Sequence, residues 1–153
     1  MAVDHGACSS RRRTVMGGAM SRPDHARRTG PALEAMYRFV LWLVPTVEKF
    51  PRSQKFLLGD RIQGAALDVV ESLVAATYTR RRATHLTDAN LGVEKLRLMF
   101  RLAMDLRYLD LKRYEHAARA LDDVGRFIGG WVKAHRAQDV QETDGEALGA
   151  SEG

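Results

Sequence analysis

A chain of 153 residues with 45% hydrophobic residues and a formal net charge of +5 has the size and composition of one soluble globular domain. Its single cysteine excludes an intramolecular disulfide and a cysteine-rich zinc site, and it leads us to expect a reducing, cytoplasmic location. No proline follows residue 51, which favours helices over strands, and the most apolar run, residues 39–44, is too short to span a membrane.

The hydrophobic pattern predicts one domain between two segments that we expect to be disordered. Residues 1–30 mix Gly, Ser, Arg and His without periodicity and indicate a basic arm. Residues 139–153 contain five acidic residues and no basic ones, which indicates an acidic tail. The packed domain is therefore expected to span residues 31–138.

The first two predicted helices span residues 32–50 and 54–80. Apolar residues recur at three- and four-residue steps in both, as in helices that bury one face. Pro45 lies inside the first helix and predicts a kink there, while Ser53 is a suitable N-cap for the second. Gly59 and Gly64 weaken the second helix by about 1 kcal/mol each, so we expect a close approach between helices, or a contact to backbone, at these positions.

The third and fourth predicted helices span residues 84–107 and 110–137. Thr84 and Asp110 are the expected N-caps. Apolar residues of the fourth helix alternate strictly at three and four positions, which is typical of a bundle helix. Long helices joined by short connections must pack antiparallel, so the sequence predicts an all-α, up-down four-helix bundle. Phe39, Trp42 and Trp131 are expected near its surface, where association of subunits would cover them.

The sequence contains no residue arrangement typical of catalysis or cofactor binding. No glutamate is followed three residues later by histidine, as di-iron bundles require, and no H-E-x-x-H or G-x-x-x-x-G-K-[ST] motif occurs. Cys8 lies in the expected arm, where nothing would hold a base beside it. We therefore expect no enzyme, no metal site and no cofactor.

The basic charge has two interpretations. Arg80, Arg81 and Arg82 follow the second helix, where they would offset the helix dipole or contact phosphates. Arg97 and Arg101 are one turn apart, and like charges at that spacing are mildly destabilising unless an anionic partner binds. Nearby carboxylates provide the alternative, which is that acidic side chains on the same helix neutralise this face.

Two segments carry a family resemblance. Residues 46–64, TVEKFPRSQKFLLGDRIQG, and residues 89–133, which include LRLMFRLA and YEHAARALDDVGRFIGGW, resemble the four-helix-bundle proteins related to the accessory variability determinant (Avd) of diversity-generating retroelements. The resemblance covers about residues 31–135. The same superfamily includes proteins encoded by intervening sequences in bacterial 23S rRNA genes, so a stand-alone bundle that only oligomerises is the alternative.

The resemblance implies a fold, an assembly and partners. The best-known members form a basic homopentameric barrel that binds the reverse transcriptase and the template RNA of the retroelement. They support mutagenic reverse transcription, in which adenines are miscopied, without performing chemistry themselves. The basic residues that we expect to contact nucleic acid or partner are Arg52, Lys55, Arg61, Arg80, Arg81, Arg82, Lys95, Arg97 and Arg101.

Overall fold

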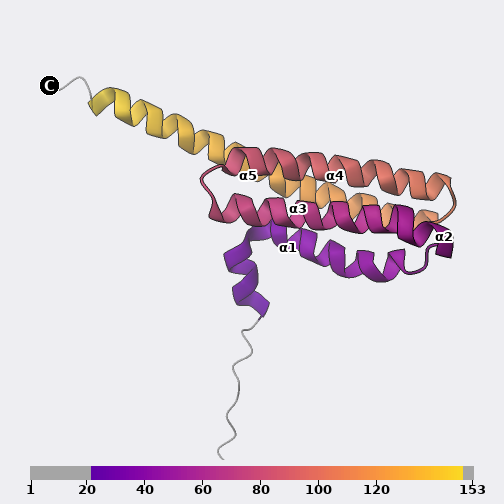
Figure 1. The fold of residues 1–153 in the computed structure, drawn as a ribbon. Coiled ribbons are helices and arrows are strands. Elements are labelled where there is room, and N and C mark those ends of the chain that lie inside the picture. Colours follow the sequence, from indigo (N-terminus) through magenta and orange to yellow (C-terminus); the bar gives the residue numbers. More distant parts are fainter. Residues whose placement is uncertain (1–21, 150–153) are drawn as a thin grey trace, which may run out of the picture.

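The computed structural model describes the backbone of residues 22–149 and the side chains of residues 30–141. This part of the chain is helical and contains no strand, and its long helices form a bundle in which successive helices run antiparallel (Figure 1). Helix α1 contacts α3 and α5, and α4 contacts the same two helices. The all-α, four-helix architecture predicted from the sequence is confirmed. The elements are α1 (Arg22–Val47), α2 (Arg52–Gln54), the π-helix η1 (Lys55–Gly59), α3 (Asp60–Tyr78), α4 (Arg82–Asp105) and α5 (Leu111–Gly149).

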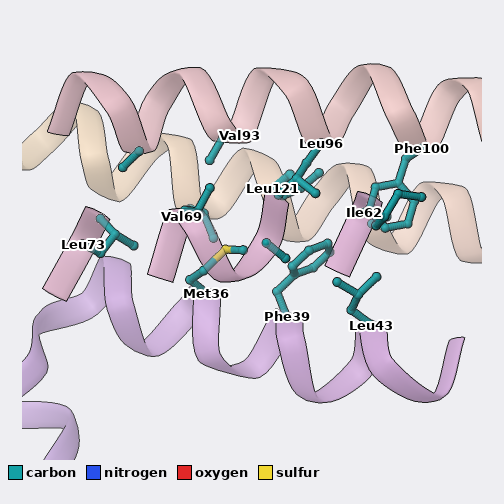
Figure 2. Packing of buried hydrophobic residues seen from close by; sticks show 14 of the residues in the cluster. Met36, Phe39, Leu43, Ile62, Val69, Leu73, Val93, Leu96, Phe100 and Leu121 are labelled. Atoms are coloured by element: carbon teal, nitrogen blue, oxygen red, sulfur yellow. The ribbon is translucent and has the colours of Figure 1, made fainter. Parts of the chain in front are cut away.

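Apolar side chains from all four long helices meet along the bundle axis (Figure 2). Met36, Ile62, Leu96 and Leu121, one from each long helix, are almost completely buried. Burying a side chain of this kind stabilises the fold by about 1.5–3 kcal/mol. The core therefore follows the three- and four-residue periodicity of the sequence.

The aromatic residues expected at the surface lie inside or against the core. Phe39 is 2% exposed, so its placement at the surface was wrong. Its ring meets that of Phe100 edge-on at 5.8 Å. Trp42 and Trp131 are half-buried and pack against the same core. Other apolar side chains, among them Tyr37, Leu41 and Leu98, are exposed at the surface.

Helix α1 bends at Gly30 and not at Pro45. Gly30 has φ 75° and ψ 163°, a conformation that glycine adopts without strain, and Pro31 opens the part of α1 that packs in the bundle. The torsion angles of Pro45 are helical, so the kink predicted there was wrong. Helix α1 ends two residues after Pro45, at Val47, so almost no helix follows the proline that a kink could redirect.

One of the three predicted N-caps forms. Oδ1 of Asp110 accepts a hydrogen bond from the backbone N–H of Arg113 at 2.8 Å, as predicted. The predictions for Ser53 and Thr84 were wrong, because α2 begins at Arg52 and α4 at Arg82, which places both hydroxyls inside the first turn. Neither of these helices has a side-chain cap.

Both outer helices extend beyond their predicted bounds. Helix α1 begins at Arg22, inside the segment expected to be a disordered arm, and α5 continues to Gly149, inside the expected acidic tail. The final turns of α5 project past the other helices (Figure 1). Residues 1–21 and 150–153 of these two segments lie outside the described part. None of the described helices combines the length and the apolarity that crossing a membrane requires.

Two glycines allow close packing between helices. A Cβ at Gly59 would lie 2.6 Å from Cγ1 of Val47, which confirms the close approach predicted there. A methyl group at Gly92 would overlap Cγ2 of Val69, so α3 and α4 also depend on a glycine. Apart from the backbone of the same helix, no atom of the described residues lies within 4 Å of a Cβ added at Gly64, so the close approach predicted at that position was wrong.

Candidate nucleic-acid interface

The nine basic residues predicted as contacts fall into two groups. Four of them are engaged within the chain: Lys55, Arg82, Arg97 and Arg101. The other five are exposed and form no ion pair or side-chain hydrogen bond with any described residue. Those five are Arg52, Arg61, Arg80, Arg81 and Lys95.

Arg97 connects α4 to α5. One Nη donates to Oε1 of Glu94 at 2.5 Å and the other to Oδ1 of Asp122 at 2.8 Å. Its Nε is buried without a hydrogen-bond partner among the described residues. A Cβ at Gly125 would lie 3.2 Å from Nη2 of Arg97, so this glycine leaves room for the guanidinium. The arrangement favours the interpretation in which carboxylates neutralise this face.

Arg101 shares a face with Arg97 but is held much more loosely. Its Nε lies 3.9 Å from Oδ2 of Asp105, and its side chain is 71% exposed. An exposed pair of this kind contributes about 0–1 kcal/mol, so the guanidinium can exchange its partner readily. Lys55 is paired with Glu48 at the same end of the bundle.

Arg82 stabilises the turn between α3 and α4. Its Nε donates to the carbonyl oxygen of Ala76 at 3.0 Å, which satisfies one free carbonyl at the C-terminal end of α3. Its guanidinium carbon lies 5.9 Å from the ring centroid of Trp131 on α5. This cation–π contact joins the turn to the last helix. Arg80 and Arg81 lie beside it, so the arginine triplet is one group with two unpaired members.

The remaining predicted contacts are dispersed. Arg52 opens α2, Arg61 lies in the first turn of α3, and Lys95 lies halfway along α4. Lys95 lines a hollow of about 220 Å³ between α3 and α4, together with Asp68 and Asp88. No group of three or more His, Cys, Asp or Glu side chains within the described part is placed to hold a metal ion. The hollow therefore carries no recognisable chemistry.

Five further cations without partners were not selected from the sequence. Lys133 and Arg136 lie near the end of α5 that passes the arginine triplet, and Lys49, Arg107 and Lys112 lie at the opposite end of the bundle. None forms an ion pair with a described residue. Helical spacing alone would have placed Lys133 and Arg136 on one face, but the sequence could not show which helix end they adjoin.

Comparison with known protein families agrees with the four-helix fold of this chain. A family model described as bAvd-like matches residues 32–135, which is more than half of the chain. The chain therefore belongs to the bAvd-like family, a family of non-catalytic accessory proteins, and the resemblance predicted from the sequence is confirmed. No curated protein and no solved structure matches it.

Proposed function

We propose that this chain is the accessory protein of a diversity-generating retroelement, and that it binds the reverse transcriptase and the template RNA in the cytoplasm. The match of its four-helix bundle to the bAvd-like family carries this proposal. The same match favours the retroelement role over that of a stand-alone bundle of the 23S rRNA intervening-sequence type.

The surface charge supports an anionic partner. Among residues 30–141, four carboxylates have no ion-pair partner: Asp60, Asp68, Glu71 and Asp88. Eleven lysines and arginines have no ion-pair partner in the same range, namely Arg82 and the ten that also lack a side-chain hydrogen bond: Lys49, Arg52, Arg61, Arg80, Arg81, Lys95, Arg107, Lys112, Lys133 and Arg136. Unpaired cations attract phosphates and release condensed counterions when they bind, so affinity for RNA is expected to fall steeply with salt.

An exposed apolar stripe along α1 and α3 supports association with further copies. Tyr37, Leu41 and Val44 recur at four- and three-residue steps and are 56%, 59% and 43% exposed. Trp42 contacts α5 from the opposite side of α1, so this stripe borders α3. Leu67 and Val74 of α3, which are also exposed, point away from the α4 side of that helix. Contiguous apolar surface of this kind commonly marks an interface.

A second stripe runs along α4. Leu91, Leu98 and Leu102 of α4, and Leu106 directly after it, recur at seven- and four-residue steps, and all four are exposed. The two stripes therefore lie on opposite sides of α3. A closed ring needs two different surfaces on each subunit, since one subunit's first surface meets its neighbour's second. This arrangement supports the homopentameric barrel that the family implies.

The proposal is tested by purifying the tagged chain after co-expression with a retroelement reverse transcriptase and its template RNA from the same genome. We expect both partners to co-purify, and the RNA to dissociate as salt is raised while the reverse transcriptase is retained. Recovery of the chain with neither partner at low salt would contradict the proposal. A tagged helical bundle of unrelated sequence and equal net charge serves as the control for non-specific binding.

A further inference from the structure

We propose that the RNA backbone binds at one corner of the bundle, formed by Arg80, Arg81, Arg82, Lys133 and Arg136 and called here the basic corner. The inference rests on the proposed function and narrows it, because it selects one site from a surface with many unpaired cations. The site combines the turn between α3 and α4 with the late turns of α5. Two of its residues, Lys133 and Arg136, had no role in the sequence-based prediction.

The packing of α4 on α5 brings these residues together. The contact between Arg97 and Asp122 sets the register of the two antiparallel helices, so the start of α4 lies beside α5 near residue 137. Counting from Asp122 in steps of four and three residues leads to Lys133 and then to Arg136. Both residues therefore lie on the same side of α5 as Asp122, which is the side that faces α4. The contact between Arg82 and the ring of Trp131 agrees with this register.

The charge at the basic corner is not neutralised from within the described part of the chain. Arg80, Arg81, Lys133 and Arg136 have no carboxylate partner there, and the nearest acidic residue along α5, Asp139, lies 2.8 Å from Nδ1 of His135. Unpaired like charges held on fixed elements repel one another. A bound phosphate chain would relieve this repulsion, which no carboxylate in the described part of the chain does.

The opposite end of the bundle has a different charge pattern. Its unpaired cations are interleaved with carboxylates, among them Glu48, Asp60, Asp105 and Asp110. The local fields there partly cancel, so the same number of cations attracts an anion less strongly. This contrast is why we assign the RNA to the basic corner and use the opposite end as a control.

Two glycines beside the basic corner fit a partner that approaches the helix backbone. Apart from the backbone of α5 itself, no described atom lies within 4 Å of a Cβ added at Gly129 or Gly130, so packing within the described chain does not require either of them. Each weakens α5 by about 1 kcal/mol relative to alanine. The missing side chains leave the surface next to Lys133 open to a sugar–phosphate chain.

The test compares two quadruple variants that each remove four unpaired charges. The corner variant carries Arg80→Gln, Arg81→Gln, Lys133→Gln and Arg136→Gln, and the control variant carries Lys49→Gln, Arg52→Gln, Arg61→Gln and Lys112→Gln. Binding of a fluorescent single-stranded RNA from the template repeat is titrated at several salt concentrations. Because each phosphate contact contributes about 0.7 to the slope of log K against log salt, the corner variant should lose about 3 units of slope and the control less than 1.

The outcomes separate the inference from the proposed function. Failure of the parent chain to bind RNA at low salt would contradict the proposed function itself. Equal losses in the two variants, or a larger loss in the control, would overturn the basic corner while leaving RNA binding intact. Retained RNA binding with lost reverse-transcriptase binding in the corner variant would also overturn it, since the corner would then be a protein-binding surface. Light scattering establishes that the two variants and the parent have the same subunit number.

A second pair of variants keeps the inference testable if the quadruple variant folds poorly. Gly129→Ala and Gly130→Ala keep all charges and should raise thermal stability, because alanine favours the helix. We expect them to weaken RNA binding by severalfold. Unchanged RNA affinity in both stabilised variants would overturn the inference that the RNA backbone closely approaches α5 at Gly129 and Gly130.

Discussion

The close contact between α3 and α4 at Gly92 can be tested by adding a single methyl group at that position. Val69, the residue that a methyl group at Gly92 would overlap, is 1% exposed and branched at Cβ. A side chain that is both buried and stiff at χ1 cannot move aside easily. Gly92→Ala should therefore force the two helices apart or push Val69 away from its preferred rotamer.

The size of the effect follows from two opposing contributions. Overpacking of a core by one methyl group costs about 1–3 kcal/mol, and replacing glycine with alanine inside a helix returns about 1 kcal/mol. Gly129→Ala gains the same helix propensity at a position with open space, so it is the matched control. The propensity contribution cancels between the two variants, and Gly92→Ala should be less stable than Gly129→Ala by about 1–3 kcal/mol.

The assay is urea denaturation followed by circular dichroism, with all proteins at one concentration because subunit association also contributes to stability. We expect the midpoint to fall for Gly92→Ala and to rise for Gly129→Ala. Equal stability of the two variants would refute the close α3–α4 contact.

Three further predictions concern single contacts. Asp110→Ala should lower the free energy of unfolding by about 1 kcal/mol, because it removes the cap of α5, and an unchanged urea midpoint would contradict that role. Arg97→Ala should destabilise the fold by about 1 kcal/mol and leave the salt slope of RNA binding unchanged. Arg101→Ala should change the free energy of unfolding by less than about 0.5 kcal/mol. A larger loss of stability for Arg101→Ala than for Arg97→Ala in urea denaturation would show that Arg97 does not join α4 to α5. Leu98→Asp combined with Leu102→Asp should leave the helical signal intact but lower the mass measured by light scattering, and an unaltered mass would exclude the α4 stripe from the subunit interface.

Much of the fold could be predicted from the sequence because each long helix carries its own periodic pattern. The positions of Met36, Ile62, Leu96 and Leu121 in the core follow from that pattern alone. The ends of the helices were less predictable, because the residue at which a helix begins depends on contacts with other elements and not on the periodic pattern. Arg82 bonds to a carbonyl of α3, and α4 consequently begins two residues before Thr84, the residue expected to cap it.

The candidate site was predictable only in part, because it depends on how helices are placed against one another. The arginine triplet was evident from the sequence, whereas the proximity of Lys133 and Arg136 required the register of α4 on α5. Arg97 and Arg101 appeared equivalent on one helix face. Their different roles come from Asp122, which lies on another helix and reaches only one of them.

Synthesis of complementary DNA tests the central claim most directly. A purified retroelement reverse transcriptase is incubated with its template RNA in the presence and absence of this chain, and the product is quantified and sequenced. An accessory role predicts that product forms from the template repeat, with substitutions at adenines, only when the chain is present, and that the corner variant supports much less of it than the charge-matched control. Equal product with and without the chain would contradict the proposed function.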